Sequence, residues 1–71
     1  MSKDTTEFIV YIIHEIANRL QIYPSAVYRA LEKADCIQKY LIPCYDVLHT
    51  MSTQCIADDV LEYLRVRGVE L

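Results

Sequence analysis

The sequence predicts an all-α protein, folded as a compact bundle of four to five short helices. Its 71 residues include only one Gly and two Pro, so few positions favour tight turns. Apolar residues make up 54% of the chain, and most recur at intervals of three and four residues, which is the helical period. We therefore expect one helical domain over residues 1–71, with an ordered core at about residues 5–67.

The first helix is predicted from a start signal and a broad apolar surface. Residues 4–7 read Asp-Thr-Thr-Glu, the spacing of a capping box with Asp4 as the N-cap. The apolar residues that follow at helical spacing are Phe8, Ile9, Ile12, Ile13, Ile16, Ala17 and Leu20. Val10 and Tyr11 widen this surface, and Glu15 and Arg19 form an i,i+4 pair opposite it. A helix so apolar lies at the centre of a fold or is shared with a partner chain.

A second helix is predicted to begin at Pro24, because proline fits the first helical position. Its apolar face is lined by Val27, Ala30, Leu31 and Ala34, with Tyr28 beside it. We expect this helix to end near residues 34–35 and a short apolar helical segment to follow at residues 37–41. Pro43 disfavours helical backbone at Ile42, so a kink or break is predicted there.

Two more helices complete the predicted bundle, from Pro43 to about Thr50 and from Ser52 or Thr53 to Arg67. The apolar face of the earlier one consists of Cys44, Val47, Leu48 and Met51, and its polar side of Asp46, His49 and Thr50. The inward stripe of the later one consists of Ile56, Val60, Tyr63 and Leu64. Gly68 stands where a left-handed residue ends a helix.

Charge and composition argue against several classes of protein. The net charge is −3 and the basic residues are scattered, whereas nucleic-acid binding needs positive charge gathered on one face. The longest apolar run, residues 8–13, is far too short to span a membrane. Cysteines 36, 44 and 55 form an odd set without a CxxC pair or a signal peptide, which indicates a reducing cytoplasm without disulfides.

The chemically reactive side chains do not form a recognisable catalytic or metal motif. Cys44 and His49 lie about 140° apart around one helix, so they cannot readily pair within it. A metal site would combine Asp46 and His49 with Cys36, Cys55 or His14, but zinc sites normally use short paired spacings. We predict no catalytic, cofactor-binding or metal residue, and no enzyme. His49 is instead interpreted as a helix-end histidine that bonds a carbonyl or Asp46.

Small size makes self-association the most economical source of extra stability, and a homo-oligomer, with a dimer favoured, is predicted. The candidate interaction residues are Phe8, Ile9, Tyr11, Ile12, Ile13, Ile16 and Tyr28. For Tyr11 and Tyr28 two interpretations stay open, the margin of the core and a protein-binding surface, because tyrosine suits both.

Residues 45–50 read YDVLHT, with Gln54, Ile56 and an acidic pair at 58–59 downstream and the block VYRAL at 27–31 upstream. In these features the chain resembles an uncharacterised bacterial family, a domain of unknown function found in small helical cytoplasmic proteins. The resemblance spans about residues 7–66 and rests on a Tyr-x-Val-Leu-His-Thr signature. The signature residues here are Tyr45, Asp46, Leu48, His49 and Thr50. This chain departs from the family at Ser52, where such proteins often have glycine.

Some members of that family look to be encoded beside proteins that resemble ADP-ribosyltransferases. The resemblance therefore implies that this chain is an accessory or toxin-neutralising partner of a neighbouring-gene product. Together with the residue patterns, it predicts a cytoplasmic, non-enzymatic protein–protein interaction module without a cofactor. The alternative is a small DNA-binding transcriptional regulator of helix-turn-helix type over residues 24–42, with Gln38 and Lys39 directed outward.

Overall fold

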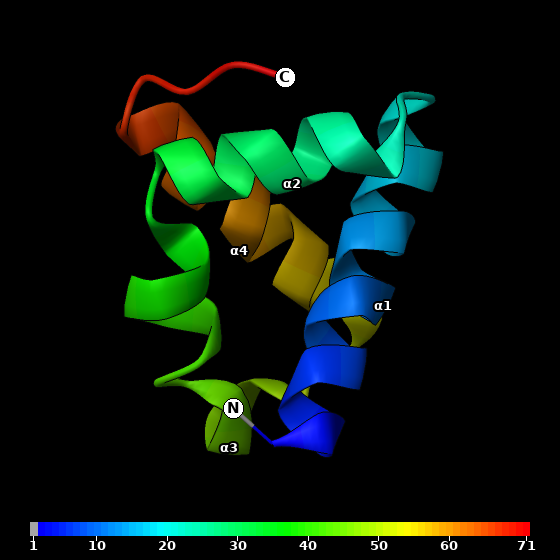
Figure 1. Ribbon diagram of the computed structural model, residues 1–71, viewed down its shortest axis with the longest axis vertical. Helices are drawn as coiled ribbons and strands as arrows, with labels where there is room; N and C mark the ends of the chain where they lie inside the picture. Colours follow the sequence, from blue (N-terminus) through cyan, green and yellow to red (C-terminus); the bar gives the residue numbers. More distant parts are fainter. Residues whose placement is uncertain (1) are drawn as a thin grey trace.

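The computed structural model describes residues 2–71, and within them helices are the only regular secondary structure. The elements are α1 (Lys3–Leu20), α2 (Pro24–Lys33), the π-helix η1 (Ile37–Leu41), α3 (Tyr45–Leu48) and α4 (Thr53–Val66) (Figure 1). The predicted all-α fold class is thus confirmed. No helix in this part of the chain is both long and apolar enough to cross a membrane.

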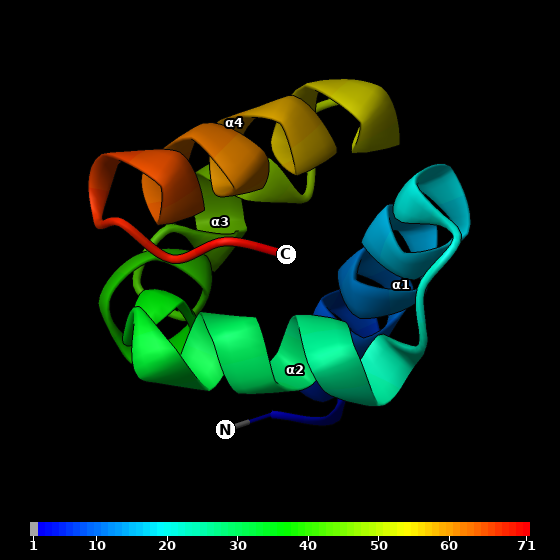
Figure 2. The same ribbon diagram turned by 90° about the horizontal axis from the view of Figure 1, so that it is seen from above.

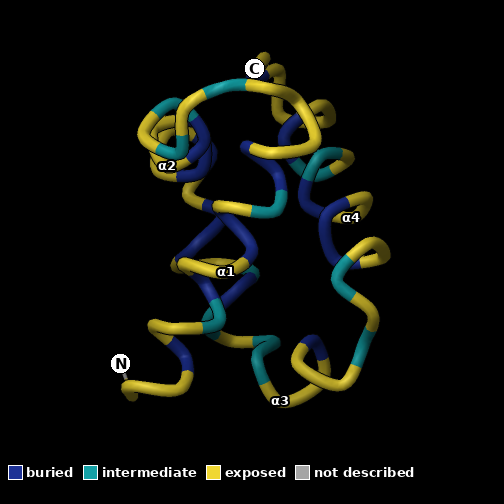
Figure 3. The backbone as a smooth tube through the Cα atoms, turned by 90° about the vertical axis from the view of Figure 1, so that its right-hand side faces the viewer, coloured by how far each residue is buried: buried dark blue, intermediate teal, exposed yellow. Residues whose placement is uncertain are grey.

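The core lies between α1, α2 and α4, with α1 packed against both of the others. Figure 2 shows these three helices around a common interior, and Figure 3 shows buried stretches alternating with exposed ones along them. The largest side chains with less than 2% exposure are Ile12, Ile16, Val27, Leu31, Leu41, Ile56, Val60 and Leu64. Each helix therefore contributes the apolar face that its sequence period indicates.

Helix α1 begins earlier than its sequence predicts. Its N-cap is Ser2, whose hydroxyl accepts a hydrogen bond from the backbone N–H of Thr5 at 3.2 Å. The prediction of Asp4 as the N-cap is therefore wrong, and Asp4 lies in the first turn instead. There its carboxylate still favours the helix, because the N-terminal end carries a partial positive charge.

The C-terminal end of α1 is linked to α4 by Arg19, whose predicted partner was Glu15. Arg19 Nη1 donates to Asp58 Oδ1 at 2.5 Å and its Nη2 to the carbonyl of Gln54 at 3.4 Å. The predicted pairing of Arg19 with Glu15 is wrong, because a cross-helix carboxylate is available. Leu20, the last member of the predicted apolar face, is 37% exposed, since α1 ends there.

Helix α2 follows its prediction closely. Pro24 stands in the first turn and the four predicted face residues, Val27, Ala30, Leu31 and Ala34, are all buried. The helix ends at Lys33, and Asp35 adopts a left-handed backbone with φ of +57°. This residue redirects the chain into η1.

The segment before Pro43 is a π-helix, which the sequence did not predict. The N–H of Ile42 donates to the carbonyl of Ile37 at 3.0 Å, a bond across five residues. Ile42 keeps a helical backbone (φ −70°, ψ −52°), so the predicted break is not at this residue. It follows at Cys44, where ψ is +11°. Pro43 has no N–H to donate, but η1 loses no hydrogen bond from this, because the N–H of Ile42 already closes the π-turn.

Helix α4 has the predicted cap and the predicted stripe. The Ser52 hydroxyl accepts from the N–H of Cys55 at 3.2 Å, while Ile56, Val60 and Leu64 are buried and Tyr63 is half-buried. After α4, Gly68 has φ of +74°, as predicted for a helix end. The N–H of Val69 then donates to the carbonyl of Leu64 at 2.9 Å, which brings the buried Val69 side chain back onto the core.

Candidate functional site

Helix α3 carries the first part of the YDVLHT signature, and its Tyr45 ring contacts two other rings. The Tyr45 ring meets the edge of Phe8 at a centroid distance of 5.3 Å and an angle of 74°. It also stacks on the His49 ring, with a centroid distance of 4.7 Å and an angle of 18°. Aromatic pairs in these geometries add stability beyond the area they bury. Tyr45 therefore attaches α3 to the start of α1.

The His49 side chain caps the end of α3 by bonding to a backbone carbonyl of the same helix. Its Nδ1 lies 2.8 Å from the carbonyl oxygen of Tyr45. Because a carbonyl only accepts, Nδ1 is the donor, and Nε2 is the nitrogen left free at the surface. Of the two partners that the sequence allows for this ring, the structure selects the carbonyl, and no hydrogen bond joins His49 to Asp46 within residues 2–71.

Of the remaining residues in the signature segment, Leu48 and Thr50 contact the protein through their side chains, whereas Asp46 and Val47 are exposed. Leu48 is buried, and the Thr50 hydroxyl donates to the carbonyl of Val47 at 2.7 Å. Asp46 is exposed, and Val47 is 66% exposed. The prediction that Val47 lies on the buried face is wrong, because α3 is a single turn from Tyr45 to Leu48 and not a helix from Pro43 to Thr50. One turn has room for few inward side chains.

The possible metal ligands do not come together. Among residues 2–71, no three side chains of the His, Cys, Asp and Glu types are placed to hold a metal ion. Cys36 is buried, Cys44 is half-buried and Cys55 is exposed, all three as free thiols. His14, a further candidate ligand, lies with its Nδ1 2.9 Å from the carbonyl of Val10.

The buried thiol of Cys36 predicts a loss of stability at alkaline pH. Burial raises its pKa from the ordinary 9.0 to about 11, against a smaller lowering by Arg67. Between these values the unfolded chain loses a proton that the folded chain keeps, so the free energy of unfolding falls as pH rises, by at most about 1.4 kcal/mol per pH unit. Urea unfolding at pH 8, 9 and 10 should show this, and Cys36→Ala should lose part of the slope. Equal slopes in both proteins would contradict the prediction.

The predicted interaction residues occupy three environments. Ile9, Ile12, Ile13 and Ile16 lie in the core of this chain, and Phe8 is half-buried. Tyr11 is 57% exposed and its hydroxyl accepts from the Thr53 hydroxyl at 3.4 Å. Tyr28 is 48% exposed. The two tyrosines therefore remain as the accessible members of the set.

Tyr28 lies beside a groove between α1, α2 and η1. This groove has a volume of about 260 Å³. It is lined by Thr6, Ile9, Val10, Ile13, Tyr28, Glu32, Ile37 and Gln38. The neighbouring Glu32 carboxylate raises the pKa of Tyr28. We call this feature the α1–α2 groove, and its lining is mainly apolar, with Thr6, Glu32 and Gln38 as polar members.

A second cluster joins η1 to the end of α4. The rings of Tyr40 and Tyr63 stack at 5.4 Å, and the Arg67 guanidinium lies 3.8 Å from the centre of the Tyr63 ring. The Tyr63 hydroxyl is buried without a hydrogen-bond partner within residues 2–71. The sequence placed Tyr63 on the inward stripe of its helix and gave no sign that it pairs with Tyr40. Their pairing depends on the π-helix, whose wider turn no local pattern had indicated.

The segment proposed as a helix-turn-helix is α2 followed by η1. Gln38 and Lys39 are exposed, as that interpretation requires. The Lys39 ammonium, however, lies 3.7 Å from the Asp35 carboxylate. The one lysine of the supposed recognition segment is therefore partly neutralised by its own chain.

Comparison with known proteins identifies the family. The model of the family described as "Protein of unknown function (DUF3791)" matches residues 7–67, most of the chain. The chain belongs to this family, and the match agrees with the resemblance inferred from the signature over residues 7–66. No curated protein and no solved structure gave a significant match.

Proposed function

We propose that this member of the DUF3791 family is a non-enzymatic interaction module that binds another protein through the α1–α2 groove. One observation carries the proposal: a mainly apolar groove lies open at the surface between α1 and α2. Exposed apolar surface of this kind is typical of interaction sites. A volume of about 260 Å³ suits one or two side chains of a partner better than a whole small-molecule ligand.

Two side chains at the edge of the groove support a protein as the ligand. Val10 is 46% exposed and Tyr28 is 48% exposed, so each offers apolar surface to a partner. Tyrosine is enriched at interfaces because its ring is apolar while its hydroxyl can bond at the rim. Glu32 forms no ion pair within residues 2–71. Its carboxylate can therefore pair with a cation of the partner.

Replacing Val10 by Asp is expected to abolish partner capture while the protein stays folded. A carboxylate placed in the groove would lose its water when the partner binds, which is costly without a counter-charge. The measurement is a pull-down from the native cell with quantitative mass spectrometry, comparing wild type, Val10→Asp and Val66→Asp. Val66 is 66% exposed on α4, away from the groove, so Val66→Asp is the matched control.

A protein that wild type and Val66→Asp both capture, and that Val10→Asp loses by about tenfold or more, supports the groove. Equal capture by all three proteins assigns binding to another surface and contradicts the proposal. The circular dichroism spectrum of Val10→Asp must match that of wild type for the comparison to apply.

The biological role that we propose is that of a cytoplasmic accessory protein in bacteria. In this role it would bind and neutralise the product of a neighbouring gene. Self-association as a dimer remains a prediction from the small size of the chain. Light scattering across a range of concentrations tests it, and a strict monomer at every concentration would contradict it.

A further inference from the structure

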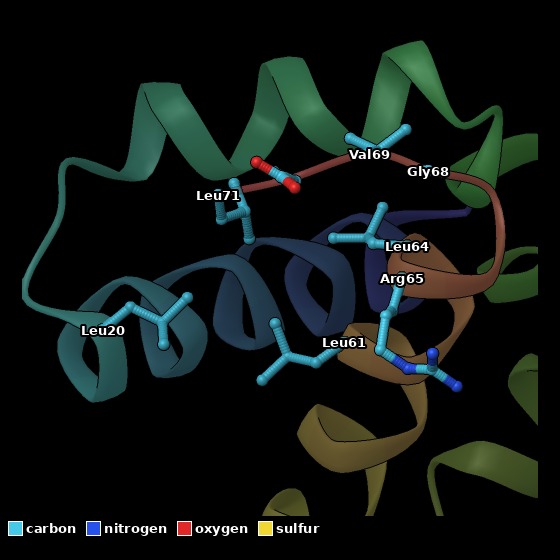
Figure 4. Close-up of a pocket in the computed structure, with 8 residues that line it drawn as sticks. Leu20, Leu61, Leu64, Arg65, Gly68, Val69 and Leu71 are labelled. Carbon is cyan, nitrogen blue, oxygen red and sulfur yellow. The ribbon is translucent and has the colours of Figure 1, made fainter.

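The last three residues cross the surface between α2 and α4 (Figure 2), and a hollow lies on each side of them. Figure 4 shows the residues that line the one toward α1 and α4. The hollow toward α1 and α4 has a volume of about 400 Å³, and its apolar lining includes Leu20, Leu61 and Leu64. The hollow along α2 has a volume of about 340 Å³, and its apolar lining includes Ile22, Ala26 and Ala30.

Val69, Glu70 and Leu71 line both hollows. We call the two hollows together the C-terminal trough and residues 69–71 the tail. Because the tail separates the hollows, it occupies a surface that is wider than the tail itself. The family match ends at residue 67, so the tail lies outside the part of the chain that defines the family.

The α2 side of the trough carries two cations without carboxylate partners. Arg29 and Lys33 stand one helical turn apart and both line the hollow. Neither forms an ion pair or a side-chain hydrogen bond within residues 2–71, whereas Arg19, Lys39 and Arg65 each pair with a carboxylate. Two uncommitted cations beside an apolar floor fit a segment that carries both apolar and acidic side chains.

The tail has this chemistry but is weakly attached. Val69 is buried, with 9% exposure, and its N–H bonds Leu64. Glu70 is exposed, Leu71 is 45% exposed, and no backbone hydrogen bond is made beyond Val69 within the residues described. The Val69 side chain thus holds the tail in place. Residues 70 and 71 can leave the surface without disturbing the core.

We propose that the C-terminal trough binds an extended acidic segment of a partner protein, which displaces the outer tail. The partner's apolar side chains enter the two hollows and its carboxylate meets Arg29 and Lys33. The tail occupies the same surface in cis and so lowers the affinity for the partner. This site is separate from the α1–α2 groove, so its test is independent of the proposed function.

The test uses the full chain with the tail weakened and Val69 kept. In Glu70→Gln/Leu71→Ser the outer tail loses both the side-chain charge of Glu70 and the apolar side chain of Leu71, and Leu71→Ser alone is the milder variant. The probe is the synthetic peptide Gly-Val-Glu-Leu with an acetylated N-terminus, titrated into isotopically labelled protein by NMR. A tail tethered in cis competes at an effective concentration in the millimolar range, so its release should tighten peptide binding by about tenfold.

Charge reversal of the trough supplies the second arm. On the weakened-tail background, Arg29→Glu/Lys33→Glu should reduce peptide affinity by about tenfold or more. Lys3→Glu/Lys39→Glu changes the net charge equally at sites outside the trough and should leave affinity unchanged. The peptide Gly-Val-Lys-Leu should bind more weakly than the acidic probe in the unreversed protein.

Three results would overturn the proposal. The first is a folded weakened-tail protein whose resonances for Ala26 and Leu61 do not move with peptide. The second is binding that is indifferent to the reversal of Arg29 and Lys33. The third is dimerisation of wild type by exchange of tails, which would make a second copy the occupant instead of a different protein.

Discussion

The variant Ile12→Asp is expected to be unfolded at 25 °C. Ile12 is 1% exposed in the middle of α1, and an aspartate there would be enclosed by apolar side chains. Burying a carboxylate without a partner costs several kcal/mol, even when the group takes up a proton to avoid its charge. A single small core supplies only about 3–5 kcal/mol of net stability, so the cost is comparable to the whole stability of the domain.

Circular dichroism and thermal melting measure this effect directly. The matched control is Val10→Asp, two residues earlier on the same helix, where the wild-type side chain is 46% exposed. This control should melt within a few degrees of wild type, because its carboxylate remains in water. An unchanged melting temperature for Ile12→Asp would show that this face of α1 is not buried in solution.

The variant Leu31→Ala is expected to lose about 2–5 kcal/mol of stability, since it leaves a cavity that α1 and α4 can only partly close. Leu31 is 0% exposed on α2. For a domain of this size the melting temperature should fall by roughly 10 °C or more. Leu20→Ala, at a site that is 37% exposed, is the control and should lose less than about 1 kcal/mol. Equal losses in the two variants would contradict the burial pattern.

The three long helices could be predicted because each carries its own local signals. Pro24 begins α2, the Ser52 hydroxyl caps α4, and Gly68 lies just beyond the end of α4 with a left-handed backbone. Their buried faces follow the 3.6-residue period, which depends on the sequence alone. The N-cap of α1 was misplaced by two residues because Ser2 and Asp4 are both good acceptors.

The region from residue 37 to residue 51 could not be predicted to the same extent. Here the segments are about one turn long, so tertiary contacts decide their conformation. The π-turn at Ile42 is an example, and so is the contact of the Tyr45 ring with Phe8 and His49. Val47 follows the helical pattern and yet is exposed, because the position of α3 depends on Tyr45 and Leu48.

The candidate surfaces depend still more on tertiary structure. Val10 and Glu32 lie 22 positions apart in the sequence and line one groove because α1 packs on α2. Nothing in the local sequence of either residue indicates the other. In the same way, Arg29 becomes a neighbour of the tail only after α4 has brought residues 69–71 back across α2. Side chains of this kind are found from the arrangement of the helices.

The packing of α1 against both α2 and α4 also bears on when the protein can fold during its synthesis. At a translation rate of about 5–20 residues per second, the start of α4 follows the end of α1 by roughly 2–7 seconds. During that interval α2, η1 and α3 are made, but the side of α1 that packs on α4 stays uncovered, and Asp58, the partner of Arg19, has not been made. The nascent chain therefore exposes part of the apolar surface of α1 until α4 has been made.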